Sequence, residues 1–154
     1  MSALYNLEAA RSEQQRARML ALEDEGVCVF CPQHIDAHQP EPVEQLGEHW
    51  YVTRNHYPYA GAVAHYLIVA RRHVVSFDEL PDEAGAELWR LRRELKARLG
   101  TVAYATVERS GDMRFNGGSV AHLHVHLVAL DREPAATVRF RVSARAAGEA
   151  ASER

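Results

Sequence analysis

The sequence lacks a long hydrophobic run, an excess of basic residues and enough cysteines for a disulfide framework. No apolar stretch approaches the roughly 20 residues of a membrane-spanning helix, and no basic-then-apolar signal follows Met1. Eighteen basic and 21 acidic residues give a net charge of −3, which argues against a protein that binds bulk nucleic acid. Two cysteines are too few for a secreted disulfide scaffold. We therefore expect a cytoplasmic protein that binds neither membranes nor bulk nucleic acid.

The 154 residues, 47% hydrophobic and 25% charged, have the composition of one ordinary globular domain. We predict a single domain over residues 1–154 with four parts. These are an N-terminal helix over 1–25, a loop rich in Cys, His and Pro over 26–48, a core over 49–131, and an edge strand with a tail over 132–154. Strands before and after one long helix indicate the α+β class.

The long helix has the clearest pattern. It follows the capping-box sequence Ser76-Phe-Asp-Glu79 and Pro81, and its leucines recur every three or four residues up to Gly100. The expected strands are residues 50–54, 65–70, 102–109, 113–116, 121–130 and 138–142. We expect the first two to be antiparallel neighbours, the third and fourth to form a hairpin, and the last to lie at an edge of the sheet.

Three histidines alternate with apolar residues in Ala121-His-Leu-His-Val-His-Leu-Val128. Because a strand alternates its faces, His122, His124 and His126 should project from one side, roughly 6.6 Å apart. Imidazole titrates near neutrality, binds metals and can act as a nucleophile. The row therefore predicts a metal site, acid–base chemistry or covalent catalysis, and its spacing alone does not choose among them. A strand with polar residues facing water is the alternative.

The turn Asn116-Gly-Gly-Ser119 directly precedes these histidines. A glycine-rich turn with a hydroxyl offers backbone N–H groups and a side-chain Oγ to an anion. This indicates a phosphate site beside the histidines, although most such turns only reverse the chain.

The His-Leu-His-Val-His-Leu-Val pattern resembles the signature of the histidine triad (HIT) nucleotide hydrolases and transferases. Residues 55–59 and 67–80 are similar to the family's first hairpin and to the start of its long helix, so the resemblance covers about residues 27–131. It implies a HIT-like α+β fold with a roughly five-stranded antiparallel sheet, commonly assembled as a homodimer. It also implies chemistry at the α-phosphate of a nucleotide through a covalent nucleotidyl-histidine.

The resemblance also implies roles for single residues. His124 would be the nucleophile, with a strand carbonyl fixing its other ring nitrogen. His126 would contact the phosphate and offer charge or a proton to the leaving group. Ser119 would act at the phosphate or leaving group as well. The further substrate-binding candidates are Asn55 at the ribose, Asn116 and Gly118. Gly118 stands where relatives carry Gln, and residues 60–64 add spacing to the first hairpin, so the leaving group and the base pocket stay open.

The pair Cys28-Val-Phe-Cys31 has the spacing of a metal or redox site. Zinc usually takes four ligands, so two histidines are needed. The local choice is His34 and His38. The long-range choice, which resembles a zinc-containing branch of the family, adds two histidines from outside the loop. We favour this second set for a structural zinc: Cys28, Cys31, His73 and His122.

Two other uses of these residues are less favoured. A redox Cys-x-x-Cys pair opens a helix after a strand, whereas this pair follows a helix and leads into Pro32. A zinc hydrolase with the triad as its three ligands conflicts with strand geometry, because residues on one face of a strand do not easily converge on one ion. The remaining strand histidines, His49, His56 and His65, are interpreted as surface or hydrogen-bonded core residues.

The sequence thus predicts a nucleotide hydrolase that cleaves a nucleoside phosphoramidate or a dinucleoside polyphosphate. The alternatives are a nucleotidyltransferase or phosphorylase of the same family and a nucleotide-binding module of low turnover. The base, the leaving group and the acceptor are not specified by the sequence.

Overall fold

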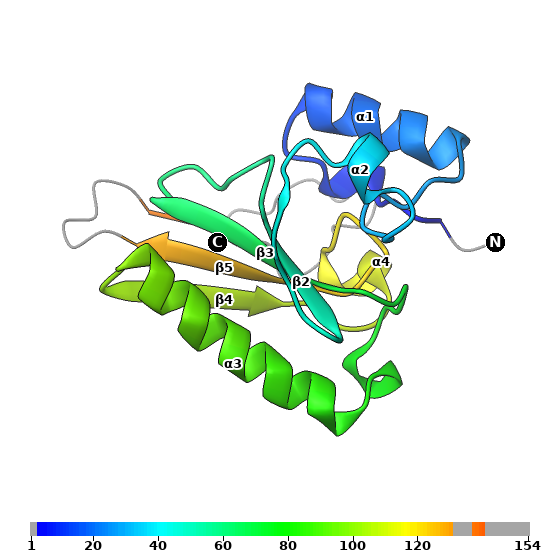
Figure 1. Ribbon diagram of the computed structural model, residues 1–154. Coiled ribbons are helices and arrows are strands. Elements are labelled where there is room, and N and C mark those ends of the chain that lie inside the picture. The colour runs from blue at the N-terminus through cyan, green and yellow to red at the C-terminus, as the bar shows by residue number, and fades with distance from the viewer. Residues whose placement is uncertain (1–2, 131–136, 141–154) are drawn as a thin grey trace.

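A computed structural model describes residues 3–130 and 137–140 (Figure 1). Its elements are η1 (Leu7–Ala9), α1 (Glu13–Asp24), α2 (Ile35–His38), β1 (Val43–Leu46), β2 (Trp50–Arg54), β3 (Ala64–Ala70), η2 (Phe77–Glu79), α3 (Asp82–Leu99), β4 (Ala103–Glu108), α4 (Met113–Asn116) and β5 (His124–Leu130). No helix among these residues is long and apolar enough to cross a membrane.

The five strands form one sheet in the order β1-β2-β3-β5-β4, and every neighbouring pair is antiparallel. The expected α+β fold with a five-stranded antiparallel sheet and one long helix is therefore confirmed. The predicted pairing of residues 50–54 with 65–70 is confirmed as well, because β2 and β3 pair along their whole common length.

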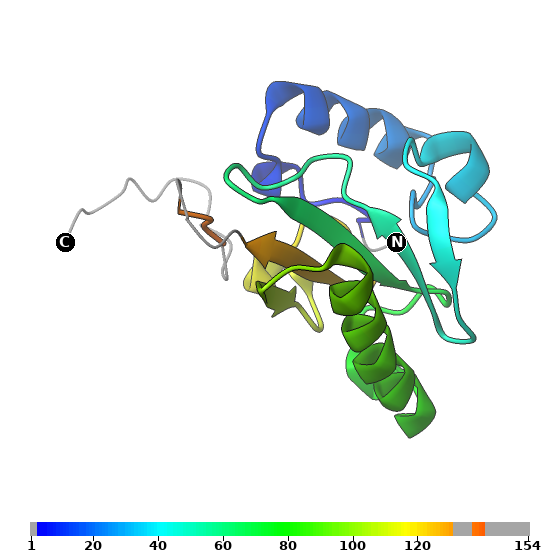
Figure 2. The same cartoon turned by 60° about the vertical axis from the view of Figure 1, so that its left-hand side comes forward.

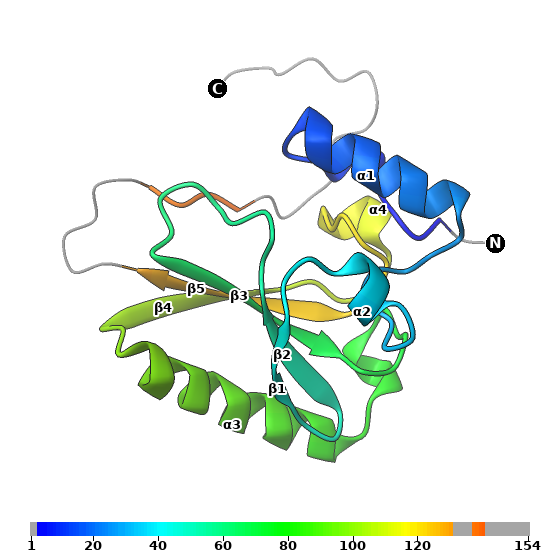
Figure 3. The same cartoon turned by 45° about the horizontal axis from the view of Figure 1, so that its top comes forward.

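Different parts of the chain cover the two faces of the sheet. In Figures 2 and 3, α3 lies along one face, and α1 with the N-terminal segment lies on the other side. Each face has its own cluster of buried residues, one beneath α3 and one beneath α1 and the cysteine loop. The central strands are therefore buried from both sides, and β2, β3 and β5 have buried residues at consecutive positions.

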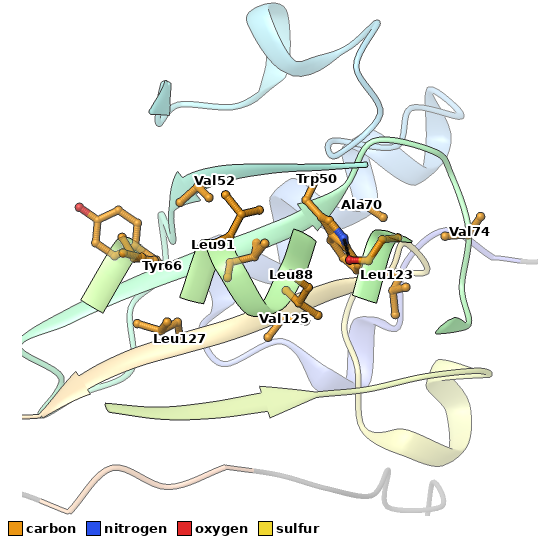
Figure 4. Packing of buried hydrophobic residues seen from close by; sticks show 13 residues of the cluster. Trp50, Val52, Tyr66, Ala70, Val74, Leu88, Leu91, Leu123, Val125 and Leu127 are labelled. Atoms are coloured by element: carbon orange, nitrogen blue, oxygen red, sulfur yellow. Dashed lines mark hydrogen bonds between the residues drawn. The ribbon is translucent and has the colours of Figure 1, made fainter. Parts of the chain in front are cut away.

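The cluster beneath α3 depends on one stripe of that helix. Leu88, Leu91 and Leu95 are buried at spacings of three and four residues, which places them on one helical face against the sheet. Figure 4 shows Leu88 and Leu91 in this contact. The Trp50 indole, on β2, donates to the carbonyl of Ala84 in the first turn of α3, with Nε1 and O 2.8 Å apart. That bond lets a large side chain be fully buried without an unsatisfied N–H.

The predicted helix over residues 1–25 is wrong in its first half. Residues 4–6 are extended beside residues 119–121, with the isolated bridge Tyr5–Val120. The Glu23 carboxylate accepts the N–H groups of Leu4 and Tyr5 at 2.9 and 2.8 Å, which ties this segment to α1. Helix α1 starts only after Ser12, whose side chain accepts from the Gln15 N–H as an N-cap. Tertiary pairing thus overrides the helical composition of the first residues.

The region 26–48 is not only a loop. It contains the short α2 and the strand β1, which pairs with β2 through a register shift between Val43 and Gln45. The prolines lie before α2 and between α2 and β1, outside both elements. They are compatible with two short elements, although they exclude one long regular element.

Two other expectations fail. Residues 113–116 form α4 instead of a hairpin strand, because the Asp112 carboxylate caps the Arg114 N–H at 2.9 Å and Gly117, at φ 74°, ends the turn. In the predicted edge strand over 138–142, residues 138–140 are not in a strand, and residues 141–142 lie outside the described residues, as does the tail after Arg145. The capping box is present but caps η2, and α3 begins after Pro81.

The sheet face opposite α3 buries several histidines. His65, on β3, is 4% exposed, and burial, then the charge of Arg11 and the neighbouring His124, lower its pKa to about 3. This imidazole is therefore neutral in the folded protein at neutral pH. Burial of His65 lowers the stability of the fold only at a pH where the imidazole of the unfolded chain binds a proton.

We expect Leu91→Ala to lower the free energy of unfolding by about 2–5 kcal/mol, because Leu91 is 1% exposed at the centre of the α3 contact. Arg93→Ala, on the exposed side of the same helix, should change it by less than about 0.5 kcal/mol. Urea unfolding of both variants measures the difference, and equal losses would contradict this packing.

Burial of His65 should make stability depend on pH. Its pKa is near 6.5 when unfolded and about 3 when folded, so the unfolded state binds the extra proton between those values. The stability contributed by neutral His65 is complete above pH 6.5 and is lost as pH falls toward 3. Between about pH 7.5 and 5.5, wild type should lose roughly 1 kcal/mol more than His65→Asn in urea unfolding. His49→Asn should behave like wild type, and equal slopes for wild type and His65→Asn would refute the assignment.

Candidate active site and metal centre

The histidine row lies at the start of β5. The strand itself begins at His124, and His122 lies in the bend just before it. The His124 and His126 side chains are each 8% exposed, with ring centroids 4.9 Å apart. The intervening apolar side chains belong to the cluster beneath α3. The predicted alternation of the two faces is therefore confirmed.

His124 has a fixed tautomer. Its Nδ1 lies 2.6 Å from the backbone carbonyl oxygen of His122, and a carbonyl only accepts, so Nδ1 carries the proton and donates it. Nε2 is left with its lone pair. Burial, with a smaller effect of the Arg109 charge, lowers the pKa of His124 to about 4. The ring is thus a neutral imidazole with one available nucleophilic nitrogen at neutral pH.

His126 is the end of a chain of hydrogen bonds. The backbone N–H of Tyr59 donates to His65 Nδ1 at 3.0 Å, so the proton of neutral His65 is on Nε2. That Nε2 lies 2.9 Å from His126 Nδ1, which must then accept. The proton of His126 is therefore on Nε2. Burial, followed by the neighbouring His124, His65 and arginines, lowers the pKa of His126 well below its usual value. His126 is a neutral hydrogen-bond donor in this arrangement.

A second cluster joins residues that are far apart in the sequence. The Sγ and Nδ1 or Nε2 atoms of Cys28, Cys31, His73 and His122 all lie within 4.8 Å of one another. Cys28 Sγ is 3.4 Å from His122 Nδ1, and Cys31 Sγ is 3.1 Å from His73 Nδ1. Two thiols and two imidazoles at this separation could hold a metal ion.

The chemistry of the four groups fits a cation. His122 Nε2 lies 2.6 Å from the carbonyl oxygen of Ala70, so it donates there and leaves the Nδ1 lone pair toward the cysteines. Burial raises the pKa of the Cys28 thiol to about 12 and also raises that of Cys31. A bound cation would offset this cost of forming thiolates in a buried site.

The other ligand sets weighed from the sequence are not assembled. His34 and His38 face each other on and beside α2, with ring centroids 6.1 Å apart. Within residues 3–130 and 137–140, neither belongs to a cluster with metal-ligand spacing, and His122 is the one triad histidine in such a cluster. Cys28 and Cys31 are free thiols.

The residues of the glycine turn have different functions: some hold the turn, and one lines the site. The Asn116 amide donates to the carbonyls of Ser110 and Gly111 at 3.2 Å, and its Oδ1 accepts the Gly118 N–H at 2.9 Å. Asn116 therefore holds the turn itself, and neither it nor Gly118 lines the hollows described next. Ser119, the last residue of the turn, lines both of them.

Two hollows meet at the triad. The first is mostly apolar and is lined by Tyr5, Arg11, Gln15, Arg18, Met19, Leu22, Val29, Phe30, Gln39, Asn55, His56, Tyr57, Leu67, Ser119, Val120, His124 and His126. The second is rich in arginine and is lined by Ala9, Arg11, Tyr59, Arg109, Gly117, Ser119, His124, His126, Arg139 and Phe140. The residues common to both are Arg11, Ser119, His124 and His126. A ligand at the triad could thus extend an apolar group to one side and anions to the other.

Sequence reasoning missed the contribution of the N-terminal segment. Gln15, Met19 and Leu22 are the buried residues of α1, spaced four and three residues apart, and all three line the apolar hollow. That spacing was the available signal. His65 was interpreted as a surface or hydrogen-bonded core residue, and the second interpretation is confirmed, because His65 is buried and hydrogen-bonded to His126.

Solved structures share this fold. The chain resembles a histidine triad nucleotide-binding protein from Candida albicans (22% identity, TM-score 0.57, covering 77% of this chain and 86% of that one). It also resembles a hypothetical histidine triad nucleotide-binding protein from Sulfolobus tokodaii (19%, 0.56, 79% and 82%). A HIT family hydrolase from Clostridium thermocellum is a third example (23%, 0.54, 70% and 94%). At these identities the likeness shows the fold alone.

A comparison with family models gives a closer assignment. No curated protein matches the chain significantly. The HIT domain model, however, matches residues 33–133, which include β1–β5, α3 and the complete histidine triad. The fold, the triad and this match agree with one another, and the chain therefore belongs to the HIT family.

Proposed function

We propose that this chain is a nucleotide hydrolase that acts at the α-phosphate through a covalent nucleotidyl-histidine on His124. The observation that supports it best is the His124 Nδ1 hydrogen bond to the His122 carbonyl, which leaves Nε2 as a neutral nucleophile where the two hollows meet. The apolar hollow would bind the base, and Asn55, which lines that hollow, would contact the ribose. The arginine-rich hollow would take the leaving group.

Two displacements make up the reaction. His124 Nε2 attacks the α-phosphorus with its lone pair, a P–N bond forms, and the bond from phosphorus to the leaving group breaks with its electron pair on that group. Water then attacks the same phosphorus and loses a proton to the solvent. The P–N bond breaks, its electron pair returns to Nε2, and a nucleoside monophosphate is released with the water's oxygen.

His126 would assist the first displacement. Its Nε2–H, set by the hydrogen-bond chain through His65, can donate to the departing atom or to a phosphate oxygen. Since His126 is buried and neutral, it would act as a hydrogen-bond donor to the departing atom or phosphate oxygen and would keep its own proton. Ser119 Oγ and the backbone of the glycine turn would hold the phosphate oxygens from the other side.

The same site could serve the alternatives. In a transferase or phosphorylase, phosphate or another acceptor would replace water in the second displacement. A low-turnover nucleotide-binding module would use the hollows without the covalent step. The intact triad with its ordered tautomers favours an enzyme. On the family resemblance, we also propose that the chain forms a homodimer, and on its composition we propose that it works in the cytoplasm.

We further propose that Cys28, Cys31, His73 and His122 hold a structural zinc. The ion would supply a cross-link that ties the cysteine loop to the segment after β3 and to the bend before β5, beside the triad. All four groups would be ligands, so no position would remain for a catalytic water. His122 would then orient His124 through its carbonyl while its side chain is held by the metal.

His124 should carry the nucleotide during turnover. Rapid-quench mass spectrometry with adenosine and guanosine phosphoramidates and a dinucleoside polyphosphate should show a nucleoside-monophosphate adduct on wild type. His124→Ala should form no adduct and lose at least about 10³-fold in rate, since it lacks the nucleophile. His49→Ala, outside both hollows, should keep the adduct. Added phosphate that appears in the product would indicate a phosphorylase, and an adduct retained in His124→Ala would disprove the mechanism.

Metal content should follow the long-range ligand set. Purified wild type should contain about one zinc per chain, as four-ligand structural sites do. Cys28→Ser should lose most of it and unfold at a lower temperature, because the ion links the loop to the sheet. His34→Ala should retain the metal. Because both ligand sets contain Cys28, elemental analysis that finds the metal lost from His34→Ala would instead support the local site.

A further inference from the structure

The N-terminal segment contributes to the site although it precedes the family match. The HIT match begins at residue 33, whereas Arg11 comes from the segment between η1 and α1. Arg11 is one of the four residues that line both hollows, together with two triad histidines and Ser119. Its position therefore lies at the junction where the proposed reaction takes place.

Three contacts hold Arg11 in this position. Its Nη2 donates to the backbone carbonyl of Tyr57, and its guanidinium carbon lies 4.5 Å from the ring centroid of Tyr59. Its backbone N–H donates to Gln15 Oε1 at 2.9 Å, which ties it to the first turn of α1. The Tyr59 ring stacks on His126 in turn, with centroids 5.5 Å apart. The cation is thus coupled to the triad through one aromatic ring.

The guanidinium keeps capacity for a ligand. It has five N–H donors, and within residues 3–130 and 137–140 its one protein acceptor is the Tyr57 carbonyl. Its charge is felt at the triad, because Arg11 is among the groups that lower the pKa of His126. Arg109 and Arg139 line the same second hollow. The planar Arg11 guanidinium, with its paired N–H donors and two more cations beside it, is suited to bind phosphate oxygens.

We propose that Arg11 is a specificity-determining residue that binds a phosphate-bearing leaving group, so that the enzyme prefers a substrate with a phosphate chain on the α-phosphate over a phosphoramidate. This inference rests on the proposed function and names the substrate class of the same site. When the P–O bond to the next phosphate breaks, the departing oxygen keeps the electron pair and gains negative charge, which Arg11 stabilises. An amine leaving group instead takes a proton and gains nothing from a neighbouring cation.

The test compares leaving groups on one nucleoside. We expect Arg11→Gln to lower the ratio of kcat/KM for diadenosine tetraphosphate to kcat/KM for adenosine phosphoramidate by about 10- to 100-fold, the effect of losing a charged hydrogen bond to phosphate. Arg11→Lys should recover part of the ratio, since it restores the charge without the fork. Arg16→Gln, an exposed arginine of α1 outside both hollows, is the matched control and should leave the ratio unchanged.

A binding measurement separates this inference from the proposed function. Wild type should bind α,β-methylene-ADP at least about 10-fold more tightly than AMP, and Arg11→Gln should remove most of that difference. If wild type turns over neither substrate, the proposed hydrolase function is contradicted. The ratio of the affinities for α,β-methylene-ADP and AMP still tests the role of Arg11. An unchanged ratio in Arg11→Gln, or no preference in wild type, overturns the role of Arg11. Wild type that binds neither compound overturns both.

Discussion

The placement of His122 is the constraint on which the rest of the site depends. Its Nε2 donates to the Ala70 carbonyl on β3, its Nδ1 faces the two cysteines, and its own carbonyl accepts from His124. One residue thus connects the sheet, the metal-binding cluster and the proposed nucleophile. Any movement of the bend before β5 would shift the tautomer-fixing bond and the thiol contacts together. Structural and chemical roles are therefore not separable at this position.

Burial sets the protonation state of the other histidines at the site. His65, His124 and His126 are each less than one-tenth exposed, and each has a lowered pKa whose largest cause is burial. The histidines consequently supply lone pairs and donors, while the positive charge of the site comes from arginines around it. This division suits phosphoryl chemistry, because a cationic nucleophile has no lone pair and an arginine cannot lose its charge.

Much of the fold could be predicted wherever local pattern and tertiary environment agree. The leucine spacing of α3 and the alternation around His124 follow from the 3.6- and two-residue periods of buried helices and strands. The failures occur where another part of the chain decides. Residues 4–6 are extended because they pair with residues 119–121, and residues 113–116 turn into α4 because Asp112 caps them. Composition does not record such partners.

The candidate site, like the fold, could be predicted from the sequence only in part. The range of chemistry open to the site was determined by the sequence alone, because three histidines on one strand face and a Cys-x-x-Cys pair limit what the residues can do. Which histidines meet the cysteines was decided by the tertiary structure, since Cys28 and His122 lie 94 residues apart and come together only when the cysteine loop packs on the sheet. The same holds for Arg11, whose side chain reaches the triad only through the packing of the N-terminal segment against Tyr57 and Tyr59. Local periodicity fixes the face on which a side chain lies, but contacts between distant segments depend on how the whole chain packs.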